Sequence, residues 1–184
     1  MNIANKVSTF RILTVPFFVS TLIYYSPERD FLRYISLFIF MLAVISDAVD
    51  GYLARKNRIK SPIGLILDPL ADKLLLISAF VGLRIVNNFP LKIRFPLWVS
   101  LIVISRDAII LLGAVLIYLL KGQLNISPSI WGKFTTLFQM VAVLSVLLQL
   151  NFSYIFWSIA VFFTLVSGAG YIWKGFKVLY EEKQ

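Results

Sequence analysis

Four aspartates carry the strongest chemical signal in the sequence. Asp47 and Asp50 are three residues apart, and Asp68 and Asp72 are four residues apart, so each pair projects from one face of a helix. All four lie in otherwise apolar stretches, where one charged side chain costs about 2.5–3.5 kcal/mol near the middle of a membrane-spanning helix. A bound cation would offset this cost.

The chain segment between the two acidic pairs predicts that they come together. Residues 55–61 form one short connection, so the helices before and after it are expected to be antiparallel neighbours. At about 1.5 Å of rise per residue, Asp50 would lie about 8 Å and Asp72 about 16 Å from this connection. The sequence therefore predicts one acidic cluster that opens toward one side of a membrane.

The residue types that are absent narrow the chemistry. With no Cys and no His, the chain excludes disulfides, thiolate or imidazole metal ligands, Cys nucleophiles and His general bases. Carboxylate oxygens favour Mg²⁺, Mn²⁺ or Ca²⁺, and four of them can hold two divalent ions that share a ligand. A phosphate or pyrophosphate substrate would complete the coordination.

A divalent cation channel or transporter is the alternative from another functional class, because buried carboxylates also mark ion pathways. Such a protein is expected to carry acidic residues at the membrane midplane or along several helices. Here the aspartates are concentrated on one helix pair near one face. This distribution favours an enzyme.

The composition determines the fold class that must position these residues. The chain has 184 residues, of which 59% are hydrophobic and 15% charged, well outside the range of soluble domains. The apolar runs predict six transmembrane helices in one all-α integral membrane domain covering residues 1–184. These runs span residues 9–25, 34–54, 62–86, 96–120, 131–150 and 153–173.

The basic residues predict the orientation. An N-terminus in the cytoplasm places most of them on that side, in agreement with the positive-inside rule, and six spans return the C-terminus there. The net charge of +9 is then explained by topology and anionic lipid headgroups rather than by nucleic acid. The residues on the cytoplasmic side would be Lys6, Arg11, Arg55, Lys56, Arg58, Lys60, Lys121, Lys133, Lys174, Lys177 and Lys183, against Arg29, Arg33, Arg84, Lys92 and Arg94 on the other.

The acidic segment also carries a family resemblance. Asp47-Ala-Val-Asp50-Gly51-Tyr-Leu-Ala54-Arg55, followed after eight residues by Gly64-Leu-Ile-Leu-Asp68-Pro-Leu-Ala-Asp72, resembles the signature of the CDP-alcohol phosphatidyltransferases. The family also has six transmembrane helices, so the resemblance extends over the whole chain. It implies an enzyme of phospholipid biosynthesis that transfers the phosphatidyl group of CDP-diacylglycerol to an alcohol and releases CMP.

The resemblance implies roles for individual residues. Asp47, Asp50, Asp68 and Asp72 would hold two divalent cations, Mg²⁺ or Mn²⁺, on the pyrophosphate, and Asp72 would be the general base that deprotonates the acceptor hydroxyl. The family further implies a homodimer among membrane lipids. A bacterial inner membrane, with the active site facing the cytoplasm, is the expected location.

Four residues of the signature are expected to bind the nucleotide. Gly51, Ala54 and Gly64 are small, which would let cytidine approach the backbone, and Arg55 offers a planar fork that suits phosphate oxygens. The alternative for the glycines is close helix packing in the membrane.

Three basic residues in shorter matching segments are candidates for binding the acceptor or a phosphate. Arg11 ends an opening segment that begins at Asn5, Arg106 lies in the fourth run, and Lys133 begins the fifth. The alternative for Arg11 and Lys133 is interfacial snorkelling, and for Arg106 it is a structural pairing with an aspartate of the third helix.

Two further expectations concern neighbours of Arg106. Asp107 is not expected to pair with Arg106, because adjacent helical side chains diverge. Ser167, Gly168 and Gly170 are expected to form a helix-packing face.

The acceptor alcohol has two candidates. The short length and the Asp-Pro-Leu-Ala-Asp-Lys run ending at Lys73 are most similar to family members that use glycerol 3-phosphate and form phosphatidylglycerophosphate. The segments around Arg106 and Lys133 are also similar to cardiolipin synthases of the CDP-diacylglycerol type, whose acceptor is phosphatidylglycerol.

Overall fold

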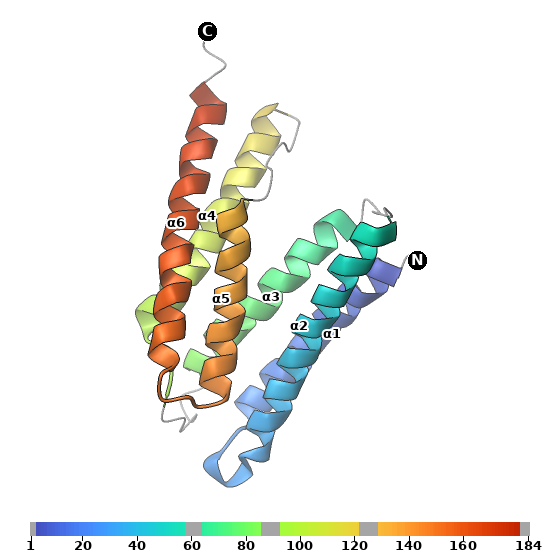
Figure 1. Cartoon of the computed structure of the whole chain (residues 1–184), viewed down its shortest axis with the longest axis vertical. Helices are drawn as coiled ribbons and strands as arrows, with labels where there is room; N and C mark the ends of the chain where they lie inside the picture. The colour runs from blue at the N-terminus through green and yellow to red at the C-terminus, as the bar shows by residue number, and fades with distance from the viewer. Residues whose placement is uncertain (1–2, 58–63, 86–92, 122–128, 181–184) are drawn as a thin grey trace. The chain divides into compact units, whose positions relative to one another are not determined.

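Six α-helices make up the part of the chain that the structure describes. The structure is a computed structural model that describes residues 3–57, 64–85, 93–121 and 129–180, with side chains at 9–49, 73–84, 93–113, 119 and 129–175. No strand occurs in these residues, so the all-α prediction is confirmed. The elements are α1 (Ile3–Ile23), η1 (Pro27–Arg29), α2 (Phe31–Asn57), α3 (Gly64–Ile85), α4 (Leu97–Lys121), α5 (Ile130–Leu147) and α6 (Ser153–Tyr180) (Figure 1).

Three of these helices are long and apolar enough to cross a membrane. Among the described residues, the candidate spans are Phe31–Val49 of α2, Ile130–Leu147 of α5 and Ser153–Gly175 of α6, and α1 has a shorter apolar segment, Thr9–Ile23. A helix suits this setting because it satisfies its backbone hydrogen bonds internally.

The chain divides into two compact units. The first contains Met1–Phe95 with Val143–Leu150, and the second contains Pro96–Ala142 with Asn151–Gln184. The four aspartates of the sequence signature belong to the first unit. Arg106 and Lys133 belong to the second.

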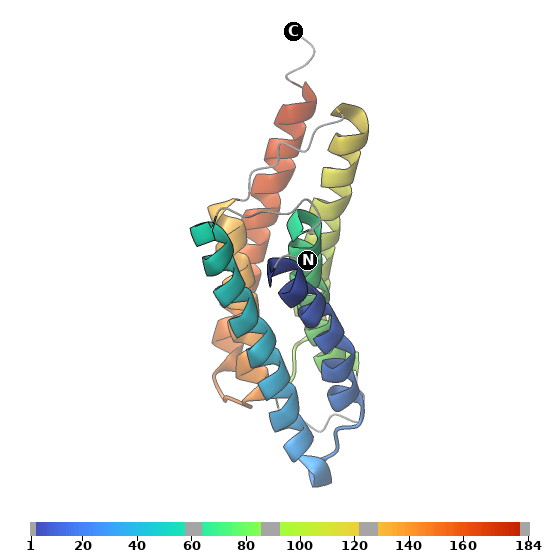
Figure 2. The same cartoon turned by 90° about the vertical axis from the view of Figure 1, so that its right-hand side faces the viewer.

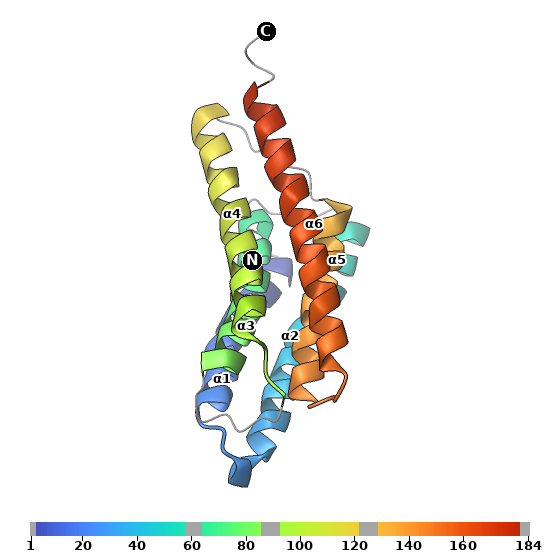
Figure 3. The ribbon, with the colours of Figure 1, turned by 90° about the vertical axis from the view of Figure 1, so that its left-hand side faces the viewer.

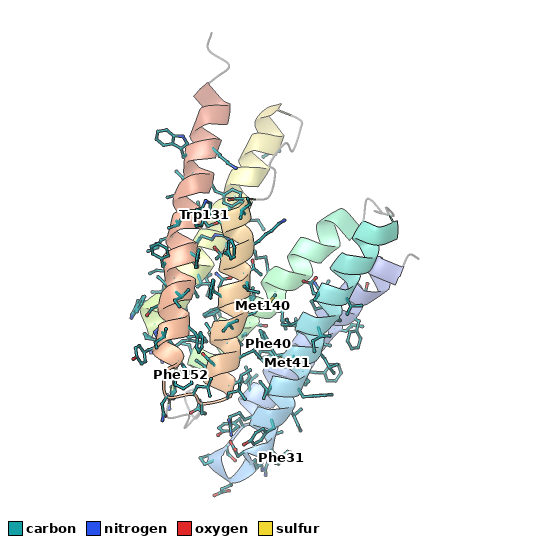
Figure 4. All side chains as sticks on the ribbon, in the orientation of Figure 1. Phe31, Phe40, Met41, Trp131, Met140 and Phe152 are labelled. Carbon is teal, nitrogen blue, oxygen red and sulfur yellow. The ribbon has the colours of Figure 1, made fainter. Side chains whose placement is uncertain are left out.

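In the first unit α1 packs against both α2 and α3. The rings of Phe18 on α1 and Phe40 on α2 lie 5.7 Å apart, and Phe40 is fully buried while Met41 beside it is 38% exposed (Figure 4). On α3, a Cβ at Gly82 would lie 2.7 Å from Leu22 Cδ1. The missing side chain of Gly82 therefore allows α1 to approach α3 closely.

A polar cluster around Asp30 lies at one end of the first unit. Arg33 donates from Nε and Nη2 to the two oxygens of Asp30 at 2.8 Å each, and its Nη1 donates to the backbone oxygen of Leu147 at 2.8 Å. Tyr25 also donates to Asp30, at 3.0 Å. The hydrogen bond from Arg33 lowers the pKa of Asp30 below its ordinary value. The pKa of Tyr25 is raised, mainly by burial and to a smaller extent by its hydrogen bond to Asp30.

Gln149 terminates α5 at the same end. Its φ of 55° lies in the left-handed region, and its backbone N–H donates to Val146 while that of Leu150 donates to Ser145, the two bonds of a Schellman cap. The side chain of Gln149 accepts from the N–H of Ile93 at 3.2 Å and donates to the carbonyl of Ile93 at 3.1 Å. The cap of α5 thereby holds the backbone that precedes α4.

In the second unit α4 packs on α6 (Figure 3). Aromatic side chains join α5 to α6. Trp131, Phe134 and Phe138 of α5 stack along Phe163 of α6, with ring centroids 6.1, 5.7 and 4.9 Å from it. The hydroxyl of Thr135 also donates to the carbonyl of Phe163 at 2.9 Å. These contacts fix the start of α5 against α6.

Candidate active site

The four signature aspartates lie on α2 and α3, each of which packs against α1. Asp47 and Asp50 lie in the C-terminal half of α2, and Asp68 and Asp72 lie in the N-terminal half of α3. The end of α2, the start of α3 and the N-terminal end of α1 lie at the same end of the first unit (Figures 1 and 2). Of the four carboxylates, that of Asp47 is described, and those of Asp50, Asp68 and Asp72 lie outside the described side chains.

Arg11 of α1 binds Asp47. Its Nη2 lies 2.7 Å from Asp47 Oδ1, and the Arg11 side chain is 2% exposed whereas that of Asp47 is 36% exposed. An arginine keeps its charge when buried, so it needs an anionic partner. The sequence suggested a phosphate for Arg11, and the structure places it on a signature aspartate.

The donor set fits a divalent cation. A carboxylate has about four lone-pair sites on two oxygens, so the ion pair with Arg11 leaves Asp47 able to bind a second partner. The chain contains no Cys or His, and the signature offers carboxylate oxygens, the ligands that Mg²⁺ and Mn²⁺ prefer. No group of three acidic side chains comes together among the described side chains, which include one of the four aspartates.

The predicted nucleotide-binding residues flank the same connection. Gly51, Ala54 and Arg55 lie on the last two turns of α2, and Gly64 is the first residue of α3. Their surroundings lie outside the described side chains, so their roles stay predictions.

Arg106 on α4 is the centre of a buried polar cluster in the second unit. Its side chain is 8% exposed, and its Nη2 donates to Ser167 Oγ of α6 at 2.5 Å. The guanidinium carbon lies 5.7 Å from the centre of the Tyr171 ring. Of the expected packing face, Gly168 packs closely, because a Cβ there would lie 3.4 Å from Arg106 Cγ. Ser167 instead accepts a hydrogen bond from Arg106, and Gly170 has no neighbour within 4 Å of its Cβ position.

The expectation for Asp107 is wrong. Arg106 Nη1 donates to Asp107 Oδ1 at 2.6 Å, and both side chains are more than nine-tenths buried. The Cα–Cβ bonds of adjacent helical residues do diverge, but the long arginine side chain curls back to its neighbour where burial leaves its charge no water.

Lys133 lies exposed in the first turn of α5. Its backbone N–H donates to Ser129 at 3.3 Å, the first bond of the helix. Its neighbour Gly132 faces the Arg106 cluster: a Cβ there would lie 3.4 Å from the Tyr171 hydroxyl and 3.6 Å from Arg106 Nη2.

Sequence reasoning missed Tyr171 as a neighbour of Arg106. Its hydroxyl accepts the backbone N–H of Ser129 at 3.2 Å. A usable signal was present: Ser167 and Tyr171 are four residues apart, so they share one face of α6.

Comparison with known proteins identifies the family. The model of the family described as CDP-alcohol phosphatidyltransferase matches residues 1–166. A CDP-diacylglycerol–glycerol-3-phosphate 3-phosphatidyltransferase of Aquifex aeolicus (strain VF5) is 33% identical over 99% of this chain and 100% of its own. The protein of the same name from Bacillus subtilis (strain 168) is 32% identical over 97% of each chain.

A third relative has a different name. It is a probable phosphatidylglycerophosphate synthase of Mycobacterium tuberculosis (strain ATCC 25618 / H37Rv), 29% identical over 93% of this chain and 80% of its own. The family match covers most of the chain, and the signature aspartates lie within it. The chain belongs to the CDP-alcohol phosphatidyltransferase family.

Proposed function

We propose that this chain transfers the phosphatidyl group of CDP-diacylglycerol to glycerol 3-phosphate, forming phosphatidylglycerophosphate and releasing CMP. The observation that supports the proposal is the complete acidic signature of the sequence, carried on α2 and α3, in a chain whose relatives are named for this reaction. Glycerol 3-phosphate is preferred to phosphatidylglycerol because the relatives' names specify it.

In this proposal the cations are held by Asp47, Asp50, Asp68 and Asp72. Arg11 orients Asp47 by binding one carboxylate oxygen at 2.7 Å, which leaves the other oxygen for a cation. Bound Mg²⁺ or Mn²⁺ supplies Lewis acidity that stabilises negative charge on the phosphates and on the departing CMP.

The remaining signature residues bind the nucleotide and move the proton. Gly51, Ala54 and Gly64 leave room for cytidine at the ends of α2 and α3, and Arg55 binds a phosphate oxygen. Asp72 accepts the proton of the acceptor hydroxyl. The hydroxyl oxygen then forms a bond to the lipid-side phosphorus, and the bond from that phosphorus to CMP breaks.

Arg106 and Lys133 bind the phosphate of the acceptor. Glycerol 3-phosphate is dianionic, and an arginine fork and a lysine ammonium are the side chains that bind such a group most strongly.

We also propose the membrane arrangement. All six helices cross the membrane as one transferase domain covering residues 1–184, with both termini and the acidic cluster on the cytoplasmic side of a bacterial inner membrane. The three candidate spans and the bacterial relatives support this arrangement. The protein works as a homodimer among membrane lipids.

The test is acceptor-dependent release of CMP. The purified full chain, in mixed micelles of detergent and CDP-diacylglycerol, is given glycerol 3-phosphate, phosphatidylglycerol, inositol phosphate or serine, with Mg²⁺, Mn²⁺ or a chelator. We expect CMP release with glycerol 3-phosphate and a divalent cation. Release with phosphatidylglycerol instead would make the chain a cardiolipin synthase, and cation flux into liposomes without CMP release would make it a transporter.

A further inference from the structure

Arg106 is buried and has more N–H donors than hydrogen-bond acceptors around it in the described part of the chain. A guanidinium has five N–H donors. One goes to Asp107 at 2.6 Å and one to Ser167 at 2.5 Å, while Nε is buried without a partner in the described part of the chain. Because the side chain is 8% exposed, water cannot satisfy these donors freely. The cluster is therefore built to receive an additional acceptor.

Gly132 of α5 faces the Nη2 side of this guanidinium. A Cβ on Gly132 would lie 3.4 Å from the Tyr171 hydroxyl, 3.6 Å from Arg106 Nη2 and 3.7 Å from Ser167 Oγ. A methyl group at this position would therefore be in van der Waals contact with three polar groups, which Gly132 leaves uncovered on this side. The Tyr171 oxygen accepts from the N–H of Ser129, so its own proton is available to an acceptor. This lining suits an anionic oxygen.

The α6 residues that contact Arg106 lie beyond the family match. The match ends at residue 166, and Ser167, Gly168 and Tyr171 follow it directly. Gly168 lets the Arg106 stem lie against α6, Ser167 holds Nη2, and the Tyr171 ring lies 5.7 Å from the guanidinium carbon. Together they restrict a long side chain that would otherwise sample many rotamers.

We propose that Ser167 and Tyr171 are positioning residues that hold the Arg106 guanidinium beside Gly132, and so determine how tightly a phosphate-bearing acceptor binds. The proposal rests on the proposed function, in which Arg106 binds the acceptor phosphate. The uncharged hydroxyl of Ser167 orients the guanidinium without neutralising it, whereas Asp107 compensates part of its charge. Pre-organisation of this kind raises affinity by reducing the entropy lost on binding.

The test uses variants that remove one polar atom each. Ser167→Ala and Tyr171→Phe are compared with Ser158→Ala and Tyr154→Phe, which alter exposed residues of the same helix. We expect Ser167→Ala to raise the KM for glycerol 3-phosphate about tenfold, the loss typical of one hydrogen bond to a charged group, with KM for CDP-diacylglycerol nearly unchanged. Tyr171→Phe keeps the ring beside Arg106 and removes only the hydroxyl, so it should raise the same KM by less. Ser167→Thr, which restores the hydroxyl, should recover most of the affinity.

A comparison of substitutions at Gly132 and Gly170 tests whether the surface beside Gly132 must stay uncovered. Gly132→Ala places a methyl among the three polar groups, whereas Gly170→Ala adds one where nothing lies within 4 Å. We expect Gly132→Ala to raise the KM for glycerol 3-phosphate and Gly170→Ala to leave it unchanged. Isothermal titration of the protein with glycerol 3-phosphate, without CDP-diacylglycerol, should show the same order of affinities.

Several outcomes would overturn the proposal. If Ser167→Ala and Gly132→Ala keep the parental KM while Arg106→Ala raises it, Arg106 binds the acceptor without help from α6. If kcat falls and both KM values stay constant, or Ser167→Thr fails to recover affinity, the cluster is structural. A parental protein that releases CMP with phosphatidylglycerol but not with glycerol 3-phosphate would instead refute the proposed function.

Discussion

The two buried arginines among the described residues each pair with an aspartate, and the two aspartates differ in their exposure. Arg11 and Arg106 are each more than nine-tenths buried and paired, at 2.7 and 2.6 Å. The partner Asp107 is 4% exposed, whereas Asp47 is 36% exposed. Asp107 is therefore enclosed with its arginine, and Asp47 remains accessible to a further ligand. This contrast supports a cation-binding role for Asp47.

The proposed base can be tested by an isosteric change. Asp72→Asn keeps the size of the side chain and removes its basicity, so we expect kcat to fall by about 100-fold to 10,000-fold, the usual contribution of a general base. Turnover is measured as CMP release, and the unfolding temperature in detergent shows whether the variant is folded. Glu28→Gln, an exposed change in η1, is the control and should retain activity. Near-parental turnover of Asp72→Asn would exclude Asp72 as the base.

Asp30 predicts a small pH dependence of stability. Hydrogen bonding from Arg33 lowers its pKa, so its contribution is fully present above the ordinary value and is lost as the pH falls through the lowered one. The unfolding temperature of the parental protein should therefore drop more between about pH 5 and pH 3 than that of Asp30→Asn. Because the Asp30 side chain is 44% exposed, salt should weaken the difference. If the unfolding temperatures of the parent and of Asp30→Asn depend on pH in the same way, the Asp30–Arg33 pair contributes nothing to stability.

At the level of single residues, the sequence predicted which carboxylates form a group better than it predicted which side chains form ion pairs. Spacing and composition singled out Asp47, Asp50, Asp68 and Asp72 as a group. The partner of Arg11 could not be predicted, because it depends on how α1 packs against α2. The Arg106–Asp107 pair was excluded from Cβ directions alone, although a side chain of arginine length can reverse direction.

At the level of elements, the apolar runs located all six helices. Their ends were less predictable, since they depend on local hydrogen bonds rather than on hydropathy. The end of α5 is an example: Gln149 adopts a left-handed conformation usually reserved for Gly or Asn. Its side-chain bonds to the backbone of Ile93, distant in sequence, compensate for that conformation.

This cap predicts an order of stabilities. Gln149→Ala keeps a Cβ in the left-handed region and loses the bonds to Ile93, whereas Gln149→Gly loses the same bonds but relieves the backbone strain. We expect the free energy of unfolding of the alanine variant to be about 1 kcal/mol lower than that of the glycine variant. Neither variant should be more stable than the parent. Thermal unfolding in detergent measures the difference. An alanine variant as stable as the glycine variant would contradict the role assigned to the cap.

At the level of the whole molecule, family membership and composition agree. The Aquifex aeolicus relative aligns over 99% of the chain and 100% of its own length. The sequence alone predicted this family from residues 47–72, because metal-binding carboxylates in an apolar chain have few alternative explanations. The contribution of α6 could not be predicted in this way, because Ser167 and Tyr171 meet Arg106 only through the packing of α6 against α4.

The most direct test of the central claim follows the phosphatidyl group itself. Purified protein is incubated with CDP-diacylglycerol, Mg²⁺ and radiolabelled glycerol 3-phosphate, and CMP and labelled lipid are quantified together. The proposed transfer predicts equal amounts of both, a lipid with the mass of phosphatidylglycerophosphate, and no product with a chelator. CMP without labelled lipid, or labelled lipid formed in the presence of the chelator, would contradict it.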